Sequence, residues 1–546
     1  MPVTDANTSV ESPRPTPVAQ RGLSRLTDGQ LALVASGVLL LLGAWPLALT
    51  DIPPYQDLPN HLATVVVIEN AARYPEFVFN GFWKTNAAFF VWLIFVGKVT
   101  GLHVAARLFA LLVLGANAFV FPRFVLAFTG SRKRMVVASL LMWPMIHNWF
   151  VSTGMLDFAL AIPLSLAMLV AVLRQRRTPS VANGLLVTGL GALTWYAHVF
   201  PLLVVHMLLG IEALVRAFRK EAITTRAVVL PILPVTLLVL SSLYSQLLDK
   251  VGPMSGSVDY TTMLPVWELA YNAWAEWMYG FSKLEVTSIV PCLVLVWIGV
   301  SRRKESPPIF SKYAVLALTL LYCFSPYIVT NWFHVNSRLI PYIWMGLLLR
   351  VPETLPRKLV GLLGLSAVLY SAGMGADFVR LDRERHEFTA GIPFVPDGAR
   401  LLPLIFRHKG TSDNTRSLLH YWGYYVTEKH TSAPLLFAHS HSFPVIYSKP
   451  PPVRFNHLVL EGFAANATDP TSLCERLLKG NVVENDCDAA FRAMWGGFWA
   501  EATPLYDHVL VWDGTPEARA LIPSAYIPVF ERDRLTIYER IPTAAP

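Results

Sequence analysis

Charged residues are scarce in this sequence. Asp, Glu, Lys and Arg make up 15% of its 546 residues, against about 25% in soluble globular proteins. Apolar types make up 54%, and several apolar runs reach about 20 residues, the length at which a helix crosses a bilayer core. This composition excludes a string of soluble domains. We expect a polytopic α-helical membrane protein, because a spanning helix satisfies its own backbone hydrogen bonds.

Cysteines and glycine-rich phosphate loops are also sparse. Of the four cysteines, Cys292 and Cys323 lie in apolar runs and are expected to pack there. Cys474 and Cys487 lie in a polar region, where a disulfide and two separate buried thiols are both open. The sequence has no glycine-rich loop of the nucleotide-binding type. The net charge of +8 comes from short basic clusters between apolar runs, which indicates cytoplasmic loops rather than a nucleic-acid partner.

The basic clusters order the membrane segments. Polar residues 1–30 are expected to form a disordered cytoplasmic tail. Residues 31–375 are expected to form about eleven transmembrane helices, with a long first loop (51–102) and a second loop (248–283) on the outer side. The apolar run Leu339–Leu349 is too short to cross, so its helix is expected to begin near Asn331. An apolar piece of the first loop, Ala87–Gly97, is expected to lie at the membrane interface.

The composition changes after residue 375. Residues 376–546 are expected to form a soluble α/β or α+β domain on the extracytoplasmic, periplasmic side. Four runs have strand character: "APLLFAH" (433–439), "FPVIYS" (443–448), "HVLVWD" (508–513) and "RLTIYERI" (534–541). The stretch from Tyr506 to Arg540 predicts a strand, a helix and two further strands.

The stretch "DIPPYQDLPNHL" directly follows the first apolar run and holds titratable groups beside the bilayer. Pro59 predicts that a helix begins there. Asp57 would then precede the helix, and His61 would lie in its first turn. One interpretation is structural, with Asp57 as a helix cap and His61 as a solvated loop residue. The other is that Asp57, His61 and the nearby Asp51 take part in chemistry.

A polytopic chain with an acidic residue in a long first loop, here in "PPYQDLPNHL", resembles the GT-C glycosyltransferases. That superfamily includes protein O-mannosyltransferases, lipid A aminoarabinose transferases and oligosaccharyltransferase catalytic subunits. The motif "STGMLDFALAIPL" resembles the aminoarabinose transferases, which also place an aspartate at the start of helix four, here Asp157. The basic loop after helix two and His198 in "TWYAHVFPL" are similar to the same family.

The resemblance implies a GT-C-like bundle and an inverting sugar transfer from a polyprenyl-phosphate donor. Asp57 is then the expected base, with Asp51, Asp157 and His61 as further catalytic candidates. Arg338 is the first candidate to bind the leaving phosphate, and His334, Lys84, His198 and Arg73 are further substrate-binding candidates. Two structural interpretations stay open: Asp157 as a helix-start carboxylate, and Arg338 as an interface cation or a partner of Asp157.

The implied partners are the bilayer, the lipid-linked donor, and a glycan, lipid or protein acceptor. A bacterial inner membrane is expected, with no required cofactor and no indication of a divalent cation. "HSHS" (439–442) is a poor metal site, because a carboxylate is missing nearby. The aromatic stretch "VWELAYNAWAEWMYG" could stack on sugars or mark the membrane interface. A transporter or lipid flippase is the main alternative, although the charges gather at helix ends rather than at mid-membrane. A non-catalytic assembly protein is the third.

Overall fold

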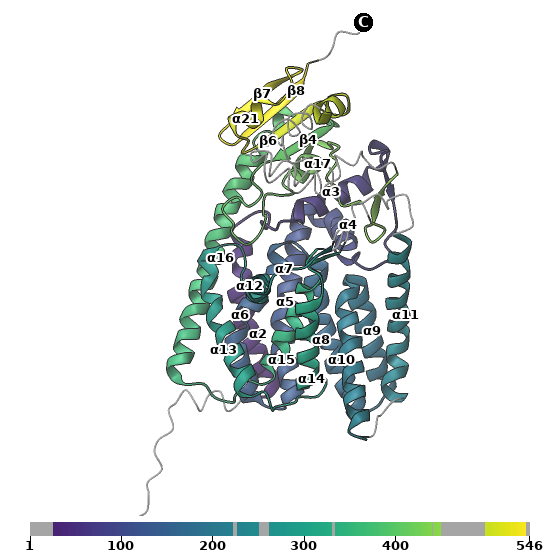
Figure 1. Ribbon diagram of the computed structural model, residues 1–546, viewed down its shortest axis with the longest axis vertical. Helices are drawn as coiled ribbons and strands as arrows, with labels where there is room; N and C mark the ends of the chain where they lie inside the picture. The colour runs from purple at the N-terminus through teal and green to yellow at the C-terminus, as the bar shows by residue number, and fades with distance from the viewer. Residues whose placement is uncertain are drawn as a thin grey trace, which may run out of the picture.

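The computed structural model describes residues 26–221, 226–249, 261–329, 333–438, 440–448 and 497–541. A helical bundle forms one part of the molecule, and a small sheet covers one end of it (Figure 1). Four features considered above lie outside the described residues: most of the expected tail, Cys474, Cys487 and His439.

Eight helical stretches of the described chain are long and apolar enough to cross a membrane. They contain α2 (Asp28–Ala44), α5 (Leu102–Thr129), α6 (Arg132–Ile146) with α7 (Trp149–Ser152), α8 (Leu156–Arg177), α10 (Val199–Phe218), α11 (Arg226–Asp249), α13 (Ile289–Ser301) and α16 (Arg357–Thr389). Three more expected segments are shorter helices: α9 (Val181–Ala197), α14 (Lys312–Phe324) and α15 (Ile340–Leu348). All eleven expected segments are therefore helical.

The expected start of the tenth helix near Asn331 is wrong. A 3-10 turn, Ser337–Leu339, leads directly into α15, and Phe333–Asn336 are not helical. Pro341 lies in the first turn of α15, where its missing N–H costs no helical hydrogen bond. The helix therefore begins at Ile340, about nine residues later than the position expected from the thickness of the bilayer.

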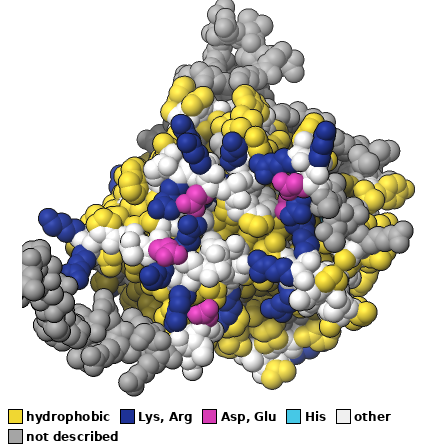
Figure 2. Space-filling model, turned by 90° about the horizontal axis from the view of Figure 1, so that it is seen from below, with side chains coloured by type: hydrophobic (Ala, Val, Ile, Leu, Met, Phe, Trp, Pro, Cys, Tyr) yellow, Lys and Arg dark blue, Asp and Glu magenta, His cyan; other side chains and the backbone are white. Residues whose placement is uncertain are grey.

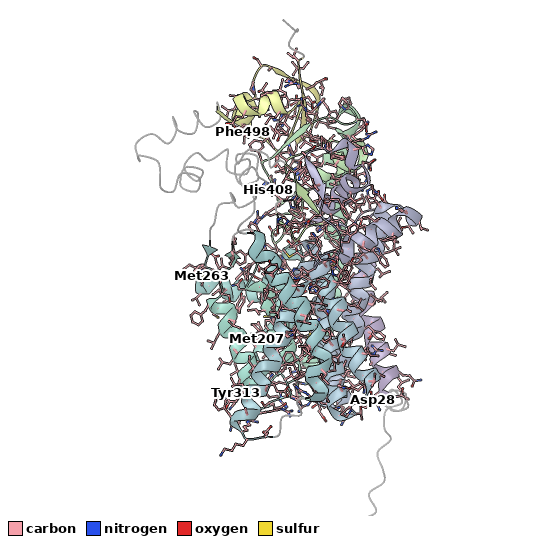
Figure 3. All side chains as sticks on the ribbon, turned by 90° about the vertical axis from the view of Figure 1, so that its right-hand side faces the viewer. Asp28, Met207, Met263, Tyr313, His408 and Phe498 are labelled. Carbon is pink, nitrogen blue, oxygen red and sulfur yellow. The ribbon has the colours of Figure 1, made fainter. Side chains whose placement is uncertain are left out.

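The basic clusters gather at the end of the bundle opposite the sheet, here called the basic end. Viewed from below, many Lys and Arg side chains cover this face (Figure 2). Arg132 lies 3.4 Å from Asp28, and Arg134 lies 2.9 Å from Glu305. Figure 3 shows Asp28 and Tyr313 at this end and Phe498 near the other. The other end, which carries the sheet, is called the sheet end.

The sheet has four strands in the order β4 (Leu401–Ile405), β6 (His508–Trp512), β8 (Leu535–Arg540) and β7 (Tyr526–Arg532). β4 pairs with β6 in parallel, and the other two pairings are antiparallel. The predicted strand, helix and two strands are confirmed as β6, α21 (Pro516–Ala520), β7 and β8. Strand β4 was not predicted; it contains Pro403, which an edge strand tolerates.

The two other predicted strand runs have different outcomes. The strand expected at 433–439 is wrong. Its described residues, 433–438, form turns, bends and irregular structure, and only the preceding Ser432 makes a β-bridge. "FPVIYS" does contain a strand, β5 (Val445–Tyr447), but it pairs with β1 (Phe77–Phe79) in the first loop rather than joining the sheet. The C-terminal part is therefore bonded to the first loop by backbone pairing.

The expected domain boundary at residue 376 falls inside helix α16. This helix runs unbroken from the basic end to the sheet (Figure 1). Its last third is charged and carries an i,i+3 ion pair between Arg385 and Asp382 at 2.8 Å, a spacing that supports helix. The helix ends at Thr389, shortly before Gly391 and Pro393. The change in composition marks an exit from the bundle, not a helix end.

Candidate active site

A cavity lies where the sheet end of the bundle meets the first loop and the C-terminal part. Its volume is about 200 Å³. The described residues that line it are Gln56, Asp57, His61, Thr85, Asn86, Met155, Leu156, Asp157, Phe158, His198, Val199, Phe333, His334, Arg338, Arg416, Leu419, His420, Phe437, Ser440, Ser442 and Phe443. Two carboxylates, two guanidinium groups and four imidazoles thus share one cavity.

Asp57 immediately precedes helix α3 (Leu58–Glu69) in the first loop. Its side chain makes no capping bond to that helix, so the interpretation as a helix cap is wrong. Oδ1 instead accepts a hydrogen bond from Gln56 Nε2 at 3.2 Å and lies 3.4 Å from His420 Nε2. The backbone N–H of Asp57 donates to the carbonyl of Thr153 at 3.0 Å. These contacts leave the carboxylate in the cavity wall.

His61 lies one turn further along α3. Its ring packs edge-on against Phe89, Phe90 and Phe437, and only 8% of the residue is exposed. The interpretation as a solvated loop residue is therefore wrong. Burial lowers the pKa of His61 to about 4, although the nearby charge of Asp57 acts in the opposite direction. The imidazole is neutral at physiological pH and can serve as a hydrogen-bonding group in the wall.

Asp157 lies in the first turn of α8 and is buried. Its Oδ1 accepts the backbone N–H of Phe89 at 2.9 Å. Phe89 belongs to the first turn of α4 (Ala88–Thr100), a helix of the first loop. The carboxylate therefore holds the start of α4 against α8 while it lines the cavity. The apolar run expected at Ala87–Gly97 is this helix.

Arg338 comes from the 3-10 turn before α15 and lies on the bundle side of the cavity. Its guanidinium is 2.7 Å from Nε2 of His198 and faces the rings of Phe158 and Phe200 at 5.2 and 5.9 Å. The carbonyl of Phe333 accepts a further bond at 3.5 Å. A guanidinium in the cavity wall can bind an anionic ligand such as a phosphate through two hydrogen bonds.

His334 also lines the cavity. Its backbone φ is +56°, a left-handed conformation that few non-glycine residues adopt. Nδ1 lies 3.2 Å from Oε1 of Glu276, which also accepts the hydroxyl of Tyr327 at 2.7 Å. Glu276 lies at a kink of α12 (Val266–Met278). Glu276 was not among the expected site residues, and its only local signal is its place in the aromatic stretch 266–280.

Three predicted site residues lie outside the cavity lining. Asp51 is exposed, with Arg107 bonding its carbonyl at 2.6 Å. Arg73 forms an exposed ion pair with Asp397 at 2.7 Å. Lys84 donates to the carbonyls of His441 and Phe443 at 3.0 and 3.3 Å. The site roles expected for Asp51, Arg73 and Lys84 are not supported by their positions. The adjacent Thr85 and Asn86 do line the cavity.

The C-terminal part contributes residues that sequence reasoning missed. Arg416 and His420 line the cavity, and both precede helix α17 (Gly423–Lys429). Gln56 Oε1 accepts the backbone N–H of Arg416 at 2.8 Å. The only local signal is a histidine within the aromatic run "HYWGYY". Within the described ranges, the structure has no group of three or more His, Cys, Asp and Glu side chains with metal-binding geometry.

One solved structure has the same architecture. The crystal structure of ArnT from Cupriavidus metallidurans bound to undecaprenyl phosphate matches with a TM-score of 0.52 and 11% sequence identity. The match covers 94% of this chain and 99% of that chain. The fold of this chain is similar to that of ArnT. The expected helical bundle with a C-terminal sheet-containing part is therefore confirmed. No protein-family model matches the sequence, and no curated protein does.

Proposed function

We propose that this protein is an integral membrane glycosyltransferase that uses a polyprenyl-phosphate-linked sugar. One observation carries the proposal: Asp57, Asp157 and Arg338, distant in sequence, line one cavity. Two further facts support it. The fold is shared with ArnT, whose crystal structure contains undecaprenyl phosphate. Eight stretches of the described chain are long and apolar enough to cross the bilayer in which such a lipid resides.

Asp57 is the proposed general base. Its carboxylate takes the proton from the acceptor hydroxyl while the acceptor oxygen attacks the anomeric carbon of the sugar. The bond between that carbon and the phosphate oxygen breaks, and the oxygen keeps the electron pair. The sugar is transferred with inversion, and polyprenyl phosphate is released. A base of this kind contributes about 10²–10⁴-fold to the rate.

Arg338 is proposed to bind the phosphate, whose negative charge grows as the bond breaks. A guanidinium can bind two phosphate oxygens at once. The neighbouring His198 is proposed to orient the guanidinium, because its Nε2 accepts a hydrogen bond from Arg338. His334 is proposed to donate a further hydrogen bond to the phosphate. Asp157 also lies in the wall. Its Oδ1 already accepts the N–H of Phe89, so its second oxygen is the one proposed to orient a sugar hydroxyl.

The proposed setting is a bacterial inner membrane with the basic end in the cytoplasm. The basic clusters would then follow the positive-inside rule. The cavity and the sheet would lie on the extracytoplasmic side, where a lipid-linked donor can enter from the bilayer. The acceptor is proposed to be a glycan, lipid or protein hydroxyl. No metal is proposed, since a carboxylate and a guanidinium can perform this displacement.

The test is transfer by the purified protein in lipid nanodiscs. Labelled polyprenyl-phosphate sugars are the donors, and envelope glycans, lipids and proteins are the acceptors. Asp57→Asn should lower the transfer rate by at least about 10²-fold, because the amide cannot accept the proton. Asp397→Asn removes an exposed carboxylate outside the cavity and should leave the rate unchanged. Absence of transfer by the wild-type protein from every donor would refute the proposal, and full activity of Asp57→Asn would refute the role of Asp57.

A further inference from the structure

The wall of the cavity is a junction between the first loop and the C-terminal part. Asn60, in the first turn of α3, bonds the C-terminal chain through both ends of its amide. Nδ2 donates to the carbonyl of Leu435 at 3.0 Å, and Oδ1 accepts the N–H of Phe437 at 3.1 Å. Asn60 is fully buried. The helix that presents Asp57 and His61 is thereby bonded to a segment more than 370 positions later.

Helix α17 packs against the same part of α3 at very close range. A Cβ atom on Gly423 would lie 2.3 Å from the carbonyl oxygen of Pro59 and 3.2 Å from the backbone nitrogen of Asn60. Since contacts under 3.0 Å essentially do not occur for real Cβ atoms, only glycine fits at this crossing. This contact places the residues just before α17 beside the start of α3.

His420 is one of those residues. It is 2% exposed, and its ring packs edge-on against Phe437 at 4.9 Å between centroids. Nε2 lies 3.4 Å from Oδ1 of Asp57. Because contacts of this kind are often long before substrate is bound and shorten in the complex, this separation is compatible with a working hydrogen bond.

We infer that His420 is a positioning residue that acts through Asp57. Nε2 faces the Asp57 carboxylate and, when it carries the ring proton, holds that carboxylate toward the cavity. The C-terminal part would thus supply a component of the catalytic centre rather than only a cover. This inference rests on the proposed function, because it assigns a partner to the proposed base.

Other titratable or charged groups face the same region. His61 approaches from α3, His408 from the segment before Arg416, Arg416 from the cavity wall and Asp157 from α8. Burial lowers the pKa of His61 to about 4 and that of His408 to about 3. Both rings therefore stay neutral over an assay range of about pH 5–8. A change in the pH profile within this range therefore does not come from either of these two rings.

The experiment compares His420→Leu, His420→Gln and His420→Asn in the nanodisc transfer assay. Leucine removes the N–H donor, so we expect a loss of about 10–100-fold in kcat, the usual effect of a hydrogen bond to a charged group. The charged form of the base also loses a stabilising partner, so the acid limb of the pH–rate profile should move to higher pH. Glutamine places an N–H near the position of Nε2 and should restore most of the rate. The shorter asparagine should not.

The matched control is His430→Leu. His430 also lies in the C-terminal part and approaches a carboxylate, Asp397, at 2.9 Å, but outside the cavity. Its loss should change neither the rate nor the acid limb. If Asp57→Asn abolishes transfer while all three His420 variants keep the wild-type rate and acid limb, the inference is overturned and the proposed function stands. If the wild-type protein transfers no sugar, both fail. If His420→Leu does not fold, the difference between glutamine and asparagine decides.

Discussion

The two ends of the helical bundle hold charge in opposite ways. At the basic end, Arg132 and Arg134 pair with acids while staying partly exposed. At the sheet end, Asp57, Asp157 and Arg338 are each less than 10% exposed and share one cavity. Charges in water are inexpensive, whereas each buried ion costs several kcal/mol. The charge of the basic end therefore suits orientation in a bilayer, and that of the sheet end suits ligand binding.

The strongest test of this comparison is the loss of the buried guanidinium. Arg338→Met should lower kcat by about 10²–10³-fold, the effect of removing one donor to a developing oxyanion. Binding of polyprenyl phosphate, measured by tryptophan fluorescence, should weaken in parallel. Thermal unfolding should change little, because the variant also removes a buried charge. A variant with wild-type transfer and lipid binding would remove Arg338 from the site.

A glycine at each end gives a test of intermediate size. Gly154 has φ of +83°, and a Cβ there would lie 2.8 Å from the backbone nitrogen of Asp57; Gly130 has φ of +64° with nothing within 4 Å. Gly130→Ala should cost only the left-handed strain of about 1–2 kcal/mol and leave transfer intact. Gly154→Ala adds displacement of Asp57, so transfer should fall by about 10-fold or more. The measurements are the unfolding curves and transfer rates of the two variants. Equal effects on transfer would show that the close approach of Gly154 to Asp57 does not affect the reaction.

The smallest effect is expected at the basic end. Arg134→Met breaks the pair with Glu305, and partly exposed pairs contribute about 0–1 kcal/mol. The unfolding temperature should shift by a few degrees at most, and transfer should stay within about twofold of wild type by the same argument. A loss of transfer comparable to that of Arg338→Met would contradict the division between the two ends.

Much of the fold could be predicted because membrane helices leave a local signal. Every expected span contains a helix, although the tenth helix begins later than expected, since each span needs a long apolar run of its own. Strands β6, β7 and β8 could also be predicted, because each is a short run of strand-forming residues between turns. The errors arose where packing outweighs the pattern. In the described part of the run at 433–439, Asn60 of α3 bonds the carbonyl of Leu435 and the N–H of Phe437, so these backbone groups do not pair in a sheet.

The site was predictable only in part. Six of the expected residues line the cavity: Asp57, Asp157, His61, His198, His334 and Arg338. Each lies near the end of an apolar run, where a polar residue is conspicuous in the sequence. His420 and Arg416 were missed because only tertiary contacts bring them near Asp57, and no local sequence pattern predicts those contacts. The prediction for Lys84 was off by one residue. Thr85 and Asn86 line the cavity, whereas the ammonium of Lys84 donates to two carbonyls.

The contact between Gln56 and Arg416 joins positions 360 residues apart. At translation rates of about 5–20 residues per second, the first loop is made roughly 20–70 seconds before its partner. During that interval the nascent polypeptide holds Asp57 without the opposing wall. An incomplete polypeptide could therefore be inserted in the bilayer and yet have no finished centre, so that the order of synthesis itself delays the onset of activity.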